Sequence, residues 1–297
     1  MIGRQSVRLA EKIHFFKMTG SGNDFIVIDN RGLELDADRC KDLVRAACRR
    51  KLSVGADGLI LIENDSEADF KWRFFNADGS EAEMCGNGAR CAARFANLKN
   101  IVSKSRMSFR TMAGIIEAEI KGERVKVRMM RPRGLALDLS LQADDRPFRL
   151  HFINTGVPHV VCFTEDESSL EAADVFNWGR AFRFHSHFQP AGTNVNFALV
   201  RDAYHMAVRT YERGVEAETL ACGTGSIASA LVAAAKQLVQ SPVEIETRGG
   251  ETLTIYFETA DQNEGAGEGE GGFTNVYLEG DAKVVYEAEL WDETLRE

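Results

Sequence analysis

The sequence lacks several features that would assign it to a simple class of protein. No apolar run approaches the roughly 20 residues that a membrane-spanning helix needs. No C-x-x-C motif occurs, and no His and Cys residues have zinc-finger spacing, which argues against a structural metal site. Acidic residues outnumber basic ones, 45 to 36, and the net charge of −9 disfavours non-specific binding to nucleic acid or anionic membranes.

A secretory signal is also missing from the first 18 residues, which have neither a continuous apolar region nor a small-residue cleavage site. The chain contains six cysteines, and without a signal they favour reduced thiols in the cytoplasm. The chain has 297 residues, 44% of them hydrophobic and 27% charged. This is an ordinary globular composition, and the length suits two domains.

Four short segments recur in the same order, about 136 residues apart. Any one of these matches would be expected by chance, but four at nearly constant spacing indicate two halves with one architecture. The matching pairs are residues 15–20 with 151–156, 75–76 with 211–212, 84–88 with 221–225, and 111–114 with 247–250.

Each half predicts strands that alternate with helices. We expect one domain at residues 1–135, joined by the last strand at about 284–297, and a second domain at residues 136–283. Residues 131–150 are expected to hold the connecting segment, and the acidic, glycine-rich residues 261–272 a flexible loop. The expected elements are strands at 25–28, 59–62, 123–129, 160–163, 195–200 and 251–257, and helices at 37–50, 87–98 and 224–238.

The most informative repeated segment is a C-G-x-G turn followed by an alanine-rich helical stretch. It occurs at residues 85–88 as C-G-N-G and at residues 222–225 as C-G-T-G. Glycine lets the backbone turn sharply and present its N–H groups. The first turn of a helix has unpaired donors and a partial positive charge, so it can bind a carboxylate or phosphate and activate a thiol.

One such turn is explained equally well by a buried cysteine that packs at a helix start. Two turns at matching positions in a duplicated chain favour a functional pair. A pseudo-two-fold arrangement would bring both thiols to one cleft. A thiolate could then remove a proton from one face of a carbon while the opposite thiol delivers one to the other face. A carboxylate bound at the helix ends would help to stabilise the carbanion.

Polar residues occupy equivalent positions near the two turns. Asn23 corresponds to His159, and Asn76 corresponds to Glu212. Different polar residues in equivalent places fit an asymmetric substrate held in a symmetric frame. Each also has a plain structural interpretation: a turn residue for Asn23, a structural histidine for His159, and a solvated ion pair for Glu212 with Arg213. We interpret the other cysteines as core residues: Cys40, Cys48, Cys91 and Cys162.

The chain resembles the diaminopimelate epimerase family over residues 15–290. The resemblance is carried by F-x-K-M-T-G-S-G-N-D-F at 15–25, G-A-D-G-L at 55–59, F-F-N-A-D-G-S-E-A-E-M-C-G-N-G-A-R-C at 74–91, G-V-P-H at 156–159, G-T-N-V-N-F at 192–197 and Y-E-R-G-x-x-x-E-T-L-A-C-G-T-G at 211–225. Two departures stand out: Val157 replaces a common Asn, and Gly58 a common Gln.

The resemblance implies a cofactor-independent enzyme that interconverts LL- and meso-2,6-diaminopimelate, in lysine and cell-wall biosynthesis. It implies an α/β fold of two similar domains, each a curled, mostly antiparallel or mixed sheet around a central helix, with the active site in the cleft between them. Cys85 and Cys222 would be the acid/base pair, with His159 and Glu212 beside the reacting carbon. The residues that would hold substrate are Asn23, Asn76, Gly86, Asn87, Asn194, Glu212, Arg213, Gly223 and Thr224.

The implied partners are a small-molecule substrate and a second copy of the chain, with no metal, nucleic acid or membrane. Two alternatives remain open on the sequence. A proline-racemase-like enzyme of the same architecture also uses two cysteines, although Asn87 and residues 218–221 oppose it. A non-enzymatic switch would use a reversible disulfide between Cys85 and Cys222, and it would leave the flanking polar residues unexplained.

Overall fold

The computed structural model describes residues 12–33, 35, 37–143, 146–260, 272–291 and 293, apart from the side chains of residues 37–39. The chain divides into two compact units. The first unit is residues 1–127 with 281–297, and the second unit is residues 128–280. The flexible loop expected at 261–272 lies outside the described residues, apart from Gly272.

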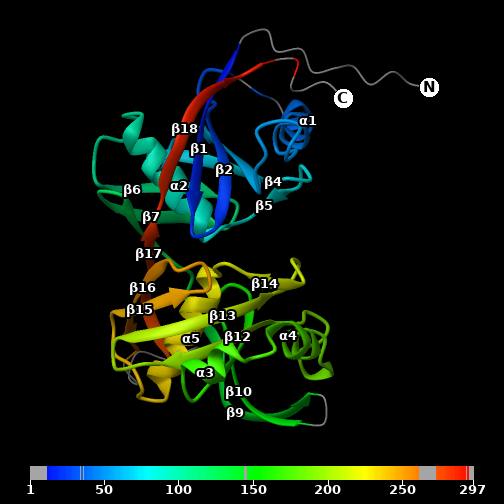
Figure 1. Cartoon of the computed structure of the whole chain (residues 1–297). Coiled ribbons are helices and arrows are strands. Elements are labelled where there is room, and N and C mark those ends of the chain that lie inside the picture. The colour runs from blue at the N-terminus through cyan, green and yellow to red at the C-terminus, as the bar shows by residue number, and fades with distance from the viewer. Residues whose placement is uncertain are drawn as a thin grey trace, which may run out of the picture. The chain divides into compact units, whose positions relative to one another are not determined.

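The first unit combines the N-terminal part of the chain with its last strand (Figure 1). Its helices are α1 (Ala37–Ala47) and α2 (Gly86–Leu98). Its strands are β1 (Ile13–Gly20), β2 (Asn23–Asp29), β3 (Gly58–Glu63), β4 (Phe70–Asn76), β5 (Glu81–Ala82), β6 (Arg106–Thr111), β7 (Gly114–Lys121), β8 (Arg124–Arg128) and β18 (Lys283–Leu290).

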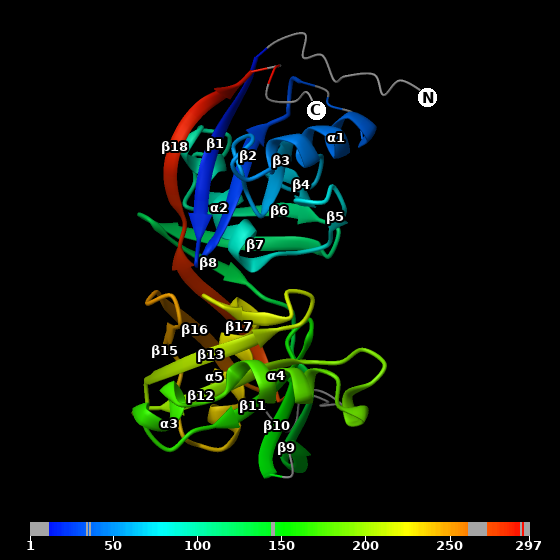
Figure 2. The same ribbon diagram turned by 45° about the vertical axis from the view of Figure 1, so that its right-hand side comes forward.

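Strand β1 lies between β18 and β2 and is antiparallel to both. Figure 2 shows β18, in red, running along β1. The sheet continues through β3, parallel to β2, and β4, antiparallel to β3. Helix α2 packs against β1, β2 and β3, and its small residues Ala89, Ala92 and Ala96 are fully buried. Their small size lets the strands approach the helix closely.

The second unit is built around α5 (Gly223–Ala235). Its other helices are α3 (Glu167–Glu171), α4 (Val175–Arg183) and the 3₁₀ helix η1 (Ser186–Phe188). Its strands are β9 (Arg133–Ala143), β10 (Arg146–Asn154), β11 (Pro158–Phe163), β12 (Asn194–Val200), β13 (His205–Glu212), β14 (Ala217–Thr219), β15 (Val243–Thr247), β16 (Thr252–Thr259) and β17 (Phe273–Asp281).

Helix α5 has no charged residue and is buried along most of its length. A helix that is apolar on all sides needs to be enclosed. Ile227 and Leu231 pack in one core with Ile245 and Leu253 of the surrounding strands. The rest of the sheet positions the candidate site: β11 is parallel to β12, and β12 is antiparallel to β13.

The structure confirms the expected mixed α/β architecture, in which strands predominate. The expected helices at 87–98 and 224–238 correspond to α2 and to α5, which ends earlier, at Ala235. Residues 131–150 differ from the expected connecting segment, because they lie mainly in the antiparallel strands β9 and β10. Pro147 is the second residue of β10, close to the strand end, where prolines are tolerated.

Candidate active site

Cys85 immediately precedes α2 and has the extended backbone of a helix N-cap residue (φ −145°, ψ 115°). Its Sγ accepts a hydrogen bond from the backbone N–H of Gly88 at 3.5 Å. An N-cap acceptor satisfies one of the unpaired donors of the first turn and lies at the positive end of the helix dipole. The sulfur of the half-buried Cys85 therefore contacts the Gly88 N–H at the helix start that the C-G-x-G motif predicts.

A directed chain of side-chain hydrogen bonds supports this turn in the first unit. Arg90 Nη2 donates to Asn87 Oδ1 at 3.0 Å, and Asn87 Nδ2 donates to Asn23 Oδ1 at 2.8 Å. Asn23 Nδ2 in turn donates to Asp57 Oδ2 at 3.0 Å. Because a guanidinium only donates and a carboxylate only accepts, the two ends of the chain fix the orientation of both amides. The structure thus brings Asn23 and Asn87 into direct contact.

Asn76 and Gly86 occupy different positions relative to this chain. Asn76 is the exposed last residue of β4, and its Nδ2 donates to Ser80 Oγ at 3.1 Å. Gly86 is the first residue of α2, and its carbonyl accepts from Arg90 Nη1 at 3.5 Å.

The Asp24 carboxyl, next to Asn23 in the sequence, is paired with Lys17 and Arg50. Burial of the Asp24 carboxyl raises its pKa, whereas the hydrogen bonds and positive charges of Arg50 and Lys17 lower it. The net effect is a lowered pKa for Asp24.

Cys222 has the equivalent place in the second unit, at the N-cap of α5, again with an extended backbone (φ −124°, ψ 107°). Cys222 is 8% exposed, and its Sγ lies 3.5 Å from Thr224 Oγ1. The Thr224 carbonyl accepts from Thr155 Oγ1 at 3.1 Å. Ser226 donates twice to the Cys222 carbonyl, through its backbone N–H at 2.9 Å and its hydroxyl at 3.0 Å. Gly223 is the first residue of the helix.

His159 lies on β11 and is completely buried. Burial and the positive charge of Arg213 lower its pKa to about 3, against a smaller opposing effect of the hydrogen bond to Asn196. Its Nδ1 lies 3.2 Å from Asn196 Nδ2. Its Nε2 is buried and makes no hydrogen bond within the part of the chain that the structure describes. A buried polar atom of this kind requires an explanation, because leaving it unpaired is costly.

The other predicted residues of the second unit surround the end of β13. Asn194 is buried, and its amide joins two backbone segments: Nδ2 donates to the Pro158 carbonyl at 3.0 Å, and Oδ1 accepts from the Arg213 N–H at 2.8 Å. Asn194 therefore ties the segment before His159 to Arg213. Glu212 is the last residue of β13, and burial raises its pKa.

Two residues that the sequence interpretation did not single out carry these networks. Arg90 is fully buried, although a basic residue on a helix normally indicates a solvated face. Nothing in the sequence pattern signals its burial. Asn196 lies two residues after Asn194 on β12, so strand alternation places both on one face of the sheet. That spacing could have identified Asn196.

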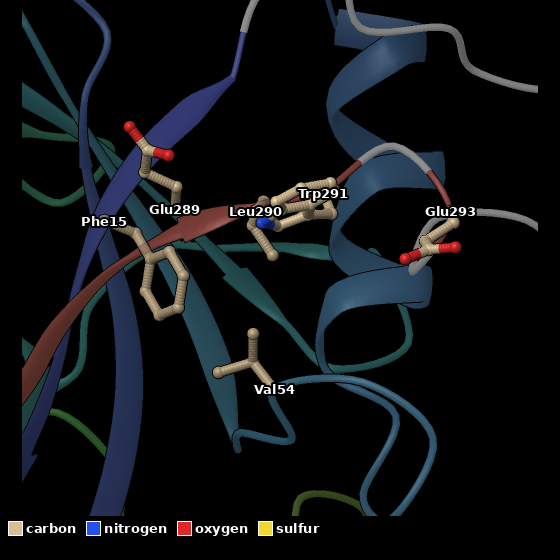
Figure 3. Close-up of a pocket in the computed structure, with 6 residues that line it drawn as sticks. All are labelled: Phe15, Val54, Glu289, Leu290, Trp291 and Glu293. Atoms are coloured by element: carbon tan, nitrogen blue, oxygen red, sulfur yellow. The ribbon is translucent and has the colours of Figure 1, made fainter.

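A separate pocket of about 320 Å³ in the first unit contains none of the predicted site residues. Figure 3 shows the side chains that line it: Phe15, Val54, Glu289, Leu290, Trp291 and Glu293. Among the described residues, no group of three or more His, Cys, Asp or Glu side chains could hold a metal ion. In the same ranges, no helix has the length and apolar character that crossing a membrane requires.

Comparisons with known proteins agree with these motifs. The chain is 47% identical over 294 residues to a diaminopimelate epimerase from Aquifex aeolicus, covering 95% of this chain and 99% of that one. It is 43% identical to a diaminopimelate epimerase from Archaeoglobus fulgidus, covering 80% of this chain and 88% of that one.

Solved structures share the fold at low sequence identity. A phenazine biosynthesis protein of the PhzF family from Bacillus anthracis has a TM-score of 0.73 at 16% identity, covering 95% of this chain and 99% of that one. A hydroxyproline epimerase from Agrobacterium vitis has a TM-score of 0.69 at 14% identity, covering 96% and 94%. The sequence profile of diaminopimelate epimerases matches residues 15–133 and 151–270. This match confirms the resemblance seen in the motifs, and the chain belongs to the diaminopimelate epimerase family.

Proposed function

We propose that this protein interconverts LL- and meso-2,6-diaminopimelate without a cofactor. The family supports this substrate, and the relatives carry the name of this activity. The observation that carries the proposal is that each unit begins one buried helix with an extended N-cap cysteine, Cys85 before α2 and Cys222 before α5. Helix N-termini of this kind bind carboxylates, which diaminopimelate has at both ends.

The proposed reaction is a two-base proton transfer at the α-carbon. The thiolate of one cysteine takes the α-proton, and the electron pair of the broken C–H bond stays on the carbon. The thiol of the other cysteine delivers its proton to the opposite face, which inverts the centre and leaves that cysteine as the thiolate. The reverse reaction exchanges the two roles. No redox partner is consumed.

The remaining residues hold the substrate and stabilise the developing charge. The N–H groups of Gly86, Asn87, Gly223 and Thr224 belong to the first turns of α2 and α5, and we assign them to the substrate carboxylates. Donors aimed at a carboxylate stabilise negative charge that spreads onto it as the α-proton leaves. We assign the following side chains to orientation of the substrate: Asn23, Asn76, Asn194, Glu212 and Arg213. We assign His159 and Glu212 to supporting roles beside the reacting carbon.

Exchange of solvent deuterium into the substrate tests this function directly. The purified protein is incubated with LL-diaminopimelate in D₂O, and loss of the α-proton signal is followed by proton NMR together with formation of the meso isomer. We expect both changes, because the carbon receives its new proton from a thiol in exchange with solvent. Exchange into proline instead would support the racemase alternative. Absence of exchange into either compound would leave the thiol-disulfide alternative and overturn the proposal.

The proposal extends to location and assembly. A cytoplasmic location fits the thiols of Cys48 and Cys162, whose pKa values burial raises to about 12 and about 11, because such thiols are inert and need no oxidising compartment. We also propose a homodimer. Cell fractionation and light scattering of the purified protein test these two statements separately from the activity.

A further inference from the structure

The starting observation is the unpaired Nε2 atom of His159. The imidazole is completely buried, and this nitrogen makes no hydrogen bond within the described residues. The opposite nitrogen, Nδ1, faces the Asn196 amide at 3.2 Å. Whether Nε2 donates or accepts therefore depends on which role Asn196 imposes on Nδ1, because a neutral imidazole has one N–H and one acceptor.

The orientation of the Asn196 amide follows from its other partners. One side of the amide lies 2.8 Å from the Val160 carbonyl, which can only accept, so this side must be the NH₂ group. The other side, Oδ1, lies 2.9 Å from the Thr210 hydroxyl, which donates to it. Asn196 is directly opposite Thr210 in the antiparallel pair of β12 and β13, so strand register sets this contact.

The NH₂ group has a second hydrogen, and this hydrogen faces His159 Nδ1. The ring nitrogen must then be the acceptor, and the single proton of the neutral ring lies on Nε2. A second feature keeps Asn196 in place: a Cβ atom on Gly225 of α5 would lie 2.3 Å from Asn196 Oδ1. The helix backbone therefore packs directly against the amide, and only glycine leaves room for it.

We propose that Asn196 is a positioning residue that holds His159 as the neutral Nε2–H tautomer, so that this N–H donates a hydrogen bond to a carboxylate oxygen of the substrate. The substrate part rests on the proposed function. An α-amino acid in its ammonium form offers acceptors only at its carboxylate oxygens, which makes these the partners for a buried donor. His159 then acts as a donor that keeps its proton, and the thiols alone transfer protons.

A neutral imidazole suits this role because it supplies a donor without a buried charge. A neutral imidazole also serves as an electrophile toward a carbonyl in triosephosphate isomerase. Hydrogen bonds from a buried donor to a charged acceptor correspond to about a tenfold to hundredfold change in an equilibrium or rate constant. We expect loss of the Nε2–H orientation to reduce kcat/KM by about that factor.

Nitrogen NMR of protein labelled with ¹⁵N-histidine reads the tautomer independently of activity. In the unaltered protein we expect His159 to show an unprotonated Nδ1 and a protonated Nε2, unchanged from neutral pH to about pH 5. A proton on Nδ1, or a doubly protonated ring at neutral pH, would overturn the proposal. Addition of meso-diaminopimelate should move the Nε2–H resonance, and an unmoved resonance under saturating substrate would refute the contact.

Two variants test the role of Asn196. Asn196→Asp replaces the donor that faces Nδ1 with an acceptor, so the proton should move to Nδ1 and kcat/KM should fall about tenfold to hundredfold. Thr210→Val is the milder change: it removes the hydroxyl that anchors Oδ1 but leaves the Val160 carbonyl that fixes the NH₂ side, so we expect the Nε2–H tautomer to persist with a smaller loss of kcat/KM. Thr252→Val, at an exposed position on β16, is the matched control and should change neither property.

The outcomes separate this inference from the proposed function. If the protein does not act on diaminopimelate but the NMR result holds, the tautomer assignment stands and the proposed substrate fails. If the protein is active but Asn196→Asp retains the Nε2–H tautomer, the inference fails and the function stands. Should Asn196→Asp not fold, nitrogen NMR of the unaltered protein still decides the tautomer.

Discussion

Both units hold a cysteine at the start of a buried helix, but different side chains surround the two cysteines. In the first unit the Cys85 sulfur accepts from the Gly88 N–H. In the second unit the Cys222 sulfur lies beside the Thr224 hydroxyl instead. The repeated C-G-x-G motif therefore gives both turns the same N-cap backbone conformation. The residue in its third position differs: Asn87 donates to Asn23, and Thr224 lies beside the cysteine sulfur.

The difference is larger one turn further along each helix. Five residues after Cys85, Arg90 is fully buried and donates to Ser21, Asn87 and two backbone carbonyls. Five residues after Cys222, the corresponding Ile227 is a core residue. In the first unit, Arg90 of α2 donates to Asn87 in the turn, and Asn87 in turn donates to Asn23 of β2. In the second unit the turn receives hydrogen bonds from Thr155 and from Ser226, and the Asn196 amide packs against Gly225.

The contrast separates what the two helix starts share from what differs behind them. Both helix starts keep the cysteine and the glycines that the proposed chemistry needs. The residues behind them differ: the Arg90 guanidinium donates to Asn87 in the first turn, and the Asn196 amide packs against Gly225 in the second.

The strongest test of the shared part is removal of each thiol. Cys85→Ala and Cys222→Ala should each reduce epimerisation by about 10²- to 10⁴-fold, the contribution of a general acid or base. Circular dichroism should be unchanged in both, because alanine fits a helix start sterically. Rates within a few-fold of the unaltered protein in either variant would disprove the two-base assignment, since one thiol would then suffice.

Replacement of Arg90 tests the part that differs. Arg90→Leu should lower the free energy of unfolding by about 2–4 kcal/mol, because it leaves the Asn87 and Ser21 oxygens without a buried donor. The equivalent change in the second unit, Ile227→Val, should cost only about 0.5–1.5 kcal/mol. Urea denaturation measures both. Equal losses in the free energy of unfolding would mean that the hydrogen bonds of the Arg90 guanidinium contribute no more to stability than the packing of an aliphatic core residue.

The third residues after the two cysteines give a finer comparison. A Cβ on Gly225 would lie 2.3 Å from Asn196 Oδ1, whereas a Cβ on Gly88 would lie 3.3 Å from the flexible end of Ile60. We expect Gly225→Ala to cost about 1–3 kcal/mol through overpacking, and Gly88→Ala less than about 1 kcal/mol. Thermal unfolding of both variants decides this. A larger loss for Gly88→Ala would show that the sheet does not hold Asn196 rigidly.

The repeat and the two cysteine turns could be predicted because they depend on local rules. Glycines and a cysteine directly before an alanine-rich run favour a helix start, and α2 and α5 begin there. The strands at 25–28 and 59–62 are continuous apolar runs, and they fall within β2 and β3.

The supporting residues could not be predicted, because their roles depend on contacts between distant segments. Arg90 is buried by Ser21 and the Asp281 carbonyl, neither of which is near it in the sequence. Asn196 acquires its role from the parallel register of β11 and β12, which no single strand encodes. The prediction of a connecting segment at residues 131–150 is wrong, because the turn-forming residues there mark the ends of the strand pair β9 and β10 within the second unit.

The smallest predicted effect concerns acid, and it again separates the units. Burial lowers the pKa of His151 to about 4 and of His159 to about 3, both in the second unit. Unfolding restores their usual pKa of 6.5, so the unfolded chain binds more protons below that pH, and stability is lost as the pH falls from about 6.5 toward the folded values. In the first unit, Asp24 has a lowered pKa, and its contribution to stability is lost only below the ordinary carboxyl pKa of 3.8.

Hydrogen exchange at about pH 7.5 and about pH 5.5, corrected for the intrinsic exchange rate, should therefore show the second unit losing protection while the first unit keeps it. Glu212 works in the opposite direction, because its raised pKa lets the folded state gain a proton as the pH falls. The sharper readout is a difference between variants. His151→Gln should remove about 1 kcal/mol of the pH-dependent loss in the second unit, since one buried neutral imidazole then no longer opposes protonation. If His151→Gln loses as much protection as the unaltered chain, the acid sensitivity has another source, and the electrostatic contrast between the units does not extend beyond their cysteine turns.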